Sequence, residues 1–260
     1  MRWIRAEHYD DMCERAASRI FTEVSTAAET GRPCGLGLAT GNTMIGVYRR
    51  LARKLNDART PLDRLTTFNL DEYVGADGRN VGSDHPLSYR TYMNTMLFSL
   101  LDPALEFDTA RAFFPDAADP ARYDGRISGA GGIDLQLLGI GFNGHIAFNE
   151  PAGADTADAD DFARSPSRTI SLDALTITTN ARLTAGGDIN AMPVQAVTMG
   201  MASILAARAV ILLACFPEQA APLNAIIANG VTPENPASFL LGHRACDIVY
   251  TADRIVLTGV

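Results

Sequence analysis

Hydrophobic positions along this chain follow two alternating patterns. Apolar residues spaced four apart predict an amphipathic helix over residues 10–30, namely Met12, Ala16, Ile20 and Val24. Gly31 and Pro33 follow this segment and end the helix. Short apolar runs predict buried strands at residues 34–39, 65–70, 133–139, 210–215 and 247–251. Helical spacing recurs at residues 43–56, 88–101, 120–127, 199–206 and 217–228.

Strands that alternate with helices indicate βαβ crossovers, which build a mostly parallel sheet covered by helices on both faces. We therefore expect a single Rossmann-like α/β domain over residues 1–260. Residues 152–167 differ from the rest because they are small and acidic. They could form a solvated loop or a mobile lid over a site, since long loops in compact domains are often functional.

Composition and charge exclude several classes of partner. The net charge of −8 argues against nucleic acid, because phosphate neutralisation needs clustered Lys and Arg. No apolar run approaches the roughly 20 residues of a membrane span, and residues 1–7 lack the apolar core of a signal peptide. The four cysteines show neither paired nor metal-ligand spacing. We expect a cytoplasmic protein with reduced thiols and neither a nucleic-acid nor a membrane partner.

Ligands of open parallel sheets bind beyond the carboxyl ends of the strands. The first loop in such a position contains Thr40, Gly41, Asn42 and Thr43, between a predicted strand and a predicted helix. Gly41 permits a tight turn, and the N-terminus of the helix offers N–H groups to an anion such as phosphate. An ordinary turn with a threonine N-cap would have the same sequence, so both interpretations stay open.

The second loop begins with Asp71 and Glu72, directly after the predicted strand 65–70. Successive side chains of an extended segment point to opposite sides, so we expect only one of these carboxylates to face a site. Catalysis and a helix-capping or solvated pair are equally consistent with this pattern.

The third loop follows the predicted strand 133–139, and its Gly139, Gly141 and Gly144 match the dinucleotide fingerprint G-x-G-x-x-G. The position in mid-chain and Pro151 argue against this function, because no long apolar helix can follow. The acidic residues about 20 positions further on belong to the stretch 152–167 rather than to a second strand.

His145 gives this third loop its best chemical interpretation. Histidine is the side chain best suited to gain and lose a proton near neutral pH. Asn143 and Glu150 flank His145 and could hold its imidazole in one tautomer and orientation. His8, His85 and His243 have no comparable surroundings.

Three segments of the chain resemble the glucosamine-6-phosphate deaminase family, whose members are also called glucosamine-6-phosphate isomerases. These segments are residues 38–43, 67–75 and 141–151. Residues 167–169, 180–182 and 196–200 also fit, so the resemblance covers nearly the whole chain. The related 6-phosphogluconolactonases share the fold but lack the sequence Phe-Asn-Glu-Pro found here at residues 148–151.

The resemblance implies conversion of glucosamine 6-phosphate to fructose 6-phosphate and ammonia, in amino-sugar and N-acetylglucosamine catabolism, without metal or nucleotide cofactor. It implies that Asp71 moves a proton between C2 and C1 and that His145 assists ring opening. Asn143 and Glu150 would orient His145. The remaining residues expected to bind substrate are Thr40, Gly41, Asn42, Thr43, Glu72, Gly144 and Arg182.

Three positions depart from the family pattern. Many family members have Asp where this chain has Asn143, whose amide oxygen can still accept a hydrogen bond. Met44 replaces a proline that usually follows the phosphate loop, and Gln219 stands where the family has a phosphate-contacting lysine. Losing one charge-assisted contact costs on the order of 1.5–3 kcal/mol if nothing replaces it. Either another residue such as Arg168 compensates, or the far end of the substrate differs.

Three alternatives to glucosamine 6-phosphate deamination stay open. They are deamination of galactosamine 6-phosphate, sugar-lactone hydrolysis, and sugar-phosphate sensing without catalysis. The resemblance also leaves a monomer and a homo-oligomer open. The leading interpretation requires that Asp71, His145 and the turn at Gly41 share one pocket.

Overall fold

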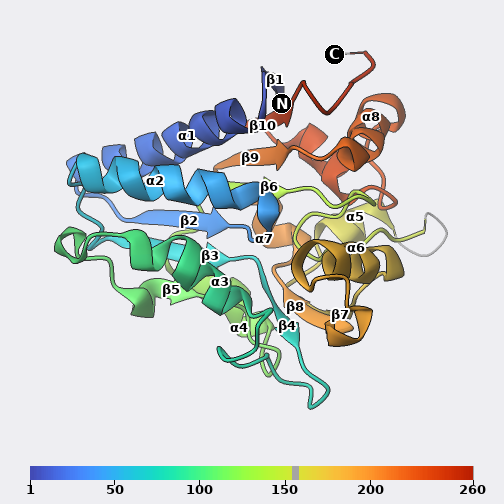
Figure 1. Cartoon of the computed structure of the whole chain (residues 1–260), viewed down its shortest axis with the longest axis horizontal. Helices are drawn as coiled ribbons and strands as arrows, with labels where there is room; N and C mark the ends of the chain where they lie inside the picture. Colours follow the sequence, from blue (N-terminus) through green and yellow to red (C-terminus); the bar gives the residue numbers. More distant parts are fainter. Residues whose placement is uncertain (154–157, 260) are drawn as a thin grey trace.

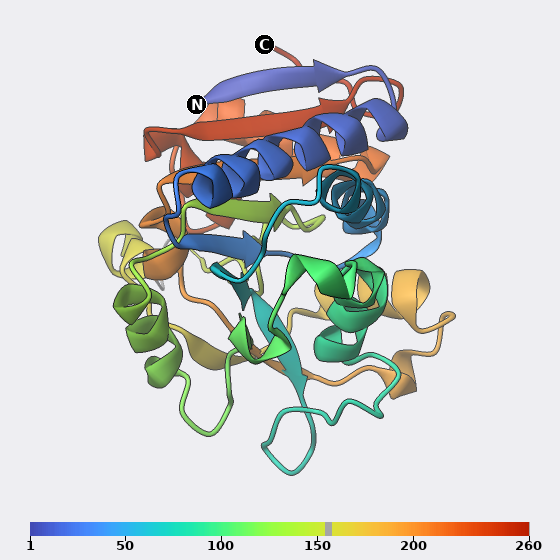
Figure 2. The same cartoon turned by 90° about the vertical axis from the view of Figure 1, so that its left-hand side faces the viewer.

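The computed structural model describes residues 1–153 and 158–259. Its main sheet has seven strands, all paired in parallel, in the order β1-β10-β9-β6-β2-β3-β5. The strands are β1 (Arg2–Ala6), β2 (Cys34–Leu38), β3 (Leu65–Asn69), β5 (Ala112–Phe113), β6 (Leu135–Gly139), β9 (Ala209–Ala214) and β10 (Cys246–Thr251). This order confirms the predicted α/β class with a mostly parallel sheet. Figure 2 shows β1 and β10 together at one edge of this sheet.

Each predicted strand corresponds to a strand of the main sheet. All residues of β2 and β3 are buried, because helices cover both faces and no polar alternation is needed. The two strands that the sequence did not predict, β1 and β5, lie at the edges of the sheet. β1 carries the exposed Arg2 and lacks a continuous apolar run, and β5 is only two residues long.

The first predicted helix is confirmed as α1 (Tyr9–Glu29), with Met12, Ala16, Ile20 and Val24 buried. It packs beside α2 (Ile45–Asp57) against the sheet (Figure 1). The other α-helices of the described chain are α3 (Tyr89–Met96), α4 (Ala121–Gly129), α5 (Ala159–Ala163), α6 (Ala174–Thr184), α7 (Met201–Leu205) and α8 (Ala220–Asn229). The helix predicted over residues 88–101 is too long, because Leu97 leaves the helical backbone conformation at φ −133°.

A second, antiparallel sheet was not predicted. Its strands, in the order β4-β8-β7, are β4 (Asp71–Val74), β8 (Gln195–Thr198) and β7 (Arg168–Ser171). With α6, this sheet lies at the end of the molecule toward which the arrows of β2, β6 and β9 point (Figure 1). It has its own small core, made of Tyr73, Phe148, Leu172, Ala181, Met192 and Ala196.

Only Leu70 separates β3 from β4, so the chain passes directly from the main sheet into the small one. The Leu70 amide donates to the Leu38 carbonyl oxygen (3.1 Å), and its own carbonyl accepts from the Met199 amide (2.7 Å). These bonds join Leu70 to segments of both sheets.

Residues 154–157 of the predicted loop or lid lie outside the described residues. After them comes α5, whose Phe162 is buried and stacks on Phe239 with 5.4 Å between ring centroids. The described part of the acidic stretch thus packs on the body of the protein. Among the described helices, none has the length and apolar character needed to cross a bilayer.

Candidate active site

A cavity of about 470 Å³ lies at the carboxyl ends of the main-sheet strands, where they meet the small sheet and α6. The three predicted loops all contribute to its lining, through Gly41, Asp71 and His145 among other residues. Asp71 is the one carboxylate and His145 the one imidazole among the described lining residues, which include neither Lys nor Arg. The arrangement follows the general rule for ligand sites of open parallel sheets.

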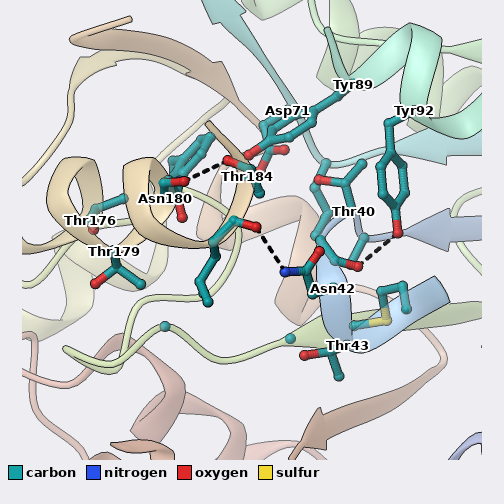
Figure 3. A pocket seen from close by; sticks show the side chains of 18 of the residues that line it. Thr40, Asn42, Thr43, Asp71, Tyr89, Tyr92, Thr176, Thr179, Asn180 and Thr184 are labelled. Carbon is teal, nitrogen blue, oxygen red and sulfur yellow. Dashed lines mark hydrogen bonds between the residues drawn. The ribbon is translucent and has the colours of Figure 1, made fainter. Parts of the chain in front are cut away.

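The turn at Gly41 is open toward the cavity, and hydrogen bonds from neighbouring elements hold its backbone in place. Gly41 has φ +102°, and no atom lies within 4 Å of where a Cβ would stand. Its carbonyl accepts from Tyr92 Oη (2.7 Å), and Asn42 Nδ2 donates to the Leu183 carbonyl oxygen (3.1 Å; Figure 3).

A 3₁₀ turn at Asn42–Met44 leads into α2, and no side chain in the described structure caps it. This disfavours the simple N-cap interpretation and leaves a helix N-terminus suited to an anion. Thr40 and Thr43 add hydroxyl groups to the lining of the cavity.

Asp71 is the first residue of β4, lines the cavity and is only 5% exposed. Burial raises the pKa of the Asp71 carboxyl well above its ordinary value, and the charge of Glu72 raises it further. A carboxylate that is poorly solvated in this way is a strong base.

Glu72 points away from the cavity, as strand alternation requires. Its carboxylate accepts hydrogen bonds from Ser88 Oγ (3.0 Å), Tyr89 N (2.9 Å) and Arg90 N (3.0 Å). Glu72 therefore caps the N-terminus of α3, which carries Tyr89 and Tyr92 into the wall of the cavity. The structure does not bring this predicted substrate-binding residue to the cavity.

The substitution Glu72→Gln is expected to destabilise the fold by about 2–3 kcal/mol, because an amide N–H would face buried N–H donors. Urea denaturation should show a lower midpoint than for the unchanged protein. Glu29→Gln, at the exposed end of α1, is the matched control. An unchanged midpoint for Glu72→Gln would contradict the capping role.

His145 is held by a short network of polar side chains. Its Nδ1 lies 3.3 Å from Glu150 Oε2 and 3.3 Å from Thr176 Oγ1. Asn143 Nδ2 donates to the same Glu150 oxygen (2.9 Å), and Asn143 Oδ1 accepts from the backbone amide of His145 (3.2 Å).

Burial opposes ionisation of Glu150, but its hydrogen bond and charge interaction with His145, with help from Asn143, lower its pKa overall. The anionic Glu150 thus orients the imidazole through Nδ1, while Nε2 has no hydrogen-bond partner among the described residues. Glu150 itself does not line the cavity.

The glycines of the third loop serve close packing rather than dinucleotide binding. A Cβ on Gly141 would stand 2.3–2.5 Å from three ring atoms of His145. Gly144 has φ +91°, and a Cβ there would meet Asn235 Oδ1 at 2.3 Å, so this predicted substrate-binding residue does not reach the cavity. Turns, with no helix, follow β6 through Pro151.

Gln219 and Arg168 both have structural partners. Gln219 is buried, donates from Nε2 to the Ile140 carbonyl (2.7 Å) and accepts through Oε1 from Cys215 N (2.7 Å) and Phe216 N (2.9 Å). Arg168 donates to Asn149 Oδ1 (2.8 Å) and does not line the cavity. Arg168 therefore does not replace the lysine that the family has at the position of Gln219.

Arg182 lies on α6 outside the cavity lining and is 60% exposed at its side chain. Its Nη2 is 3.0 Å from Glu218 Oε1, and its guanidinium carbon is 5.8 Å from the ring centroid of Phe142, which lines the cavity. The predicted phosphate-binding arginine is thus beside the cavity and engaged with a carboxylate.

Helix α6 supplies lining residues that the sequence did not predict. Thr176, Asn180 and Thr184 are four residues apart and face the Gly41 turn across the cavity, together with Thr179 (Figure 3). This polar spacing was the available signal, but no apolar pattern marked the segment as a helix. Asn180 Nδ2 donates to Tyr73 Oη (3.0 Å) and so ties α6 to β4.

Potential metal ligands and cysteines form no further site in the described part of the chain. Within the described ranges, no three His, Cys, Asp or Glu side chains are grouped to hold a metal ion. All four cysteines are free and buried.

Comparison with known proteins gives the family. A family model described as glucosamine-6-phosphate isomerases/6-phosphogluconolactonase matches residues 7–249. The chain belongs to this family. Among its relatives, a glucosamine-6-phosphate deaminase of a Geobacillus species is 36% identical to this chain. The match covers 99% of this chain and 96% of the Geobacillus protein. The glucosamine-6-phosphate deaminase of Rhodopirellula baltica is 40% identical, over 82% and 80%.

Solved structures of the glucosamine-6-phosphate isomerase/6-phosphogluconolactonase family also match. A monomeric glucosamine-6-phosphate deaminase has a TM-score of 0.85 at 30% identity and covers 98% of both chains. The 6-phosphogluconolactonase of Leishmania guyanensis has a TM-score of 0.72 at 16% identity, over 96% of this chain and 97% of its own, and shares the fold. The resemblance stated from the sequence motifs is therefore confirmed.

Proposed function

We propose that this protein deaminates glucosamine 6-phosphate to fructose 6-phosphate and ammonia. One observation carries the proposal: a buried carboxylate, an oriented imidazole and an open turn at a helix N-terminus line the same cavity. These are the groups needed to move a proton between carbons, to open a sugar ring and to hold a phosphate.

The charge of the cavity favours an amino sugar over a neutral one. Burial raises the pKa of the Asp71 carboxyl, and the charge of Glu72 raises it further. A substrate ammonium group at C2 would relieve this by placing a positive charge next to the Asp71 carboxylate. A sugar lactone offers no such cation, so this pairing supports deamination over lactone hydrolysis.

Ring opening comes first in the proposed reaction. His145, held through Nδ1 by Glu150, takes the proton of the anomeric hydroxyl and returns one to the ring oxygen. Asn143 donates a hydrogen bond to the same Glu150 oxygen and helps to keep it in place. The product of this step is the open-chain aldehyde.

Asp71 then carries the isomerisation. It removes the proton from C2 and returns it to C1. The aldehyde oxygen takes up one proton and the C2 ammonium group releases one, which leaves a hydroxyl group at C1 and a protonated imine at C2. Water hydrolyses this imine, so that the amine leaves as ammonia and the ketose phosphate remains. The phosphate at the Gly41 turn supplies binding energy remote from the reacting carbons and fixes their position.

Turnover of a panel of sugars tests this proposal, measured as ammonia release for the amino sugars and as acid release for the lactone. The panel holds glucosamine 6-phosphate, galactosamine 6-phosphate, unphosphorylated glucosamine and 6-phosphogluconolactone. We expect ammonia and fructose 6-phosphate from the first. Preference for the galacto epimer would reassign the substrate, hydrolysis of the lactone alone would establish the other reaction, and binding without turnover would indicate a sensor.

Two further expectations accompany the proposal, and the oligomeric state stays open. The reaction would serve amino-sugar and N-acetylglucosamine catabolism in the cytoplasm. Size-exclusion chromatography with light scattering would tell a monomer from a homo-oligomer.

A further inference from the structure

The phosphate end of the cavity is unusually poor in positive charge. No Lys or Arg is among its described lining residues, and the Gln219 side chain is occupied by the hydrogen bonds given above. Arg182 lies against the wall, with its guanidinium carbon 5.8 Å from the ring centroid of Phe142. Its neighbour Leu183 accepts the hydrogen bond from Asn42 of the Gly41 turn, so Arg182 lies next to the element proposed to hold phosphate.

A carboxylate already occupies this arginine. Glu218 lies between Phe216 and Gln219, both of which line the cavity, and binds Arg182 at 3.0 Å. Its pKa is lowered first by its own backbone amide and then by Arg182. Glu218 is therefore an anion held beside the place where the substrate phosphate would bind.

We propose that Glu218 is a specificity-determining residue that competes with the 6-phosphate for Arg182. This inference rests on the proposed function. An exposed Arg–Glu pair is weak, so phosphate can take the guanidinium over. Replacing Glu218 by phosphate as the partner of Arg182 costs part of the binding energy of the substrate. The Glu218 carboxylate, once displaced, also repels the nearby phosphate dianion. Both effects reduce the preference for phosphorylated over unphosphorylated amino sugar.

The opposite role for Glu218 makes an opposite prediction. If Glu218 served to position Arg182 for the phosphate, its removal would weaken substrate binding. If it competes, its removal strengthens binding. The sign of the change in KM therefore separates the two roles.

The test is the substitution Glu218→Gln, which keeps the size of a side chain that is 43% exposed and should leave the fold intact. We expect KM for glucosamine 6-phosphate to fall about 2- to 5-fold, the range of an exposed ion pair, with a smaller change in kcat. KM for unphosphorylated glucosamine should not fall. Glu29→Gln, remote from the cavity, is the matched control.

A double-mutant cycle with Arg182→Gln completes the test, because Glu218→Gln should lose its effect in that background. A KM that is unchanged or higher in Glu218→Gln would overturn the competition. If neither amino sugar is turned over, the proposed function fails, and calorimetry with inorganic phosphate still decides this inference. Tighter phosphate binding by Glu218→Gln supports it, and equal or weaker binding refutes it.

Discussion

The substitution Asp71→Asn is expected to lower kcat for glucosamine 6-phosphate by about 10²–10⁴-fold, the usual contribution of a positioned general base. The amide has nearly the shape of the carboxylate but cannot accept the C2 proton. KM should change much less, because the Gly41 turn and Arg182 remain. Steady-state kinetics with a coupled assay for ammonia measures both constants.

The same substitution should not reduce stability at neutral pH. The folded-state pKa of Asp71 is raised above its unfolded value, so burying the ionised group destabilises the fold as pH rises above the unfolded pKa. A neutral amide at this position removes the penalty, so urea denaturation at pH 7 should show equal or greater stability, and the difference should vanish in acid. A large loss of stability would mean that the lost activity reports misfolding.

The pH profile provides an independent check on Asp71. A general base acts only when deprotonated, so kcat/KM should decline on the acid side as pH falls through the raised pKa of Asp71. The residual activity of Asp71→Asn should lack this acidic limb. A limb that persists in the variant would assign it to another group.

Gly141→Ala is expected to lower kcat/KM by roughly 10²-fold, the effect of misplacing a reacting group by about 1 Å. The added methyl would stand 2.3–2.5 Å from three ring atoms of His145, so the imidazole must leave its position against Glu150. NMR of the His145 ring would show the altered environment.

Gly125→Ala is the control for this substitution. Gly125 lies in α4, no atom is within 4 Å of its Cβ position, and alanine favours a helix there. We expect full activity and slightly higher stability. Full activity of Gly141→Ala would show that the ring position is not critical.

The sequence predicted the five inner strands of the main sheet, where a short apolar run marks each strand, and it missed the two edge strands β1 and β5. It missed the small sheet, whose edge strand β7 alternates between half-buried and exposed residues, and α6, which is largely polar along the face that lines the cavity. Secondary structure of this kind depends on tertiary contacts, such as Asn180 with Tyr73, that no local pattern reveals.

The sequence predicted which residues form the centre of the candidate site, but not how the side chains around them would be arranged. Asp71, His145 and Gly41 follow strands of the same sheet, so topology alone brings them together. The alternation of side chains along a strand predicted that only one of Asp71 and Glu72 would face the cavity, but it did not predict which of the two. The partners of Gln219, Arg168 and Arg182 depend on side-chain directions that sequence position does not determine.

The single-residue junction at Leu70 has a consequence for substrate length. Its backbone bonds to Leu38 and Met199 place Asp71 at a set separation from the turn that begins two residues after Leu38. The span between the proposed base and the proposed phosphate anchor is thus set largely by main-chain hydrogen bonds. On the proposed function, we expect an amino sugar phosphate with one carbon fewer between amine and phosphate to be turned over less efficiently, which steady-state kinetics would measure.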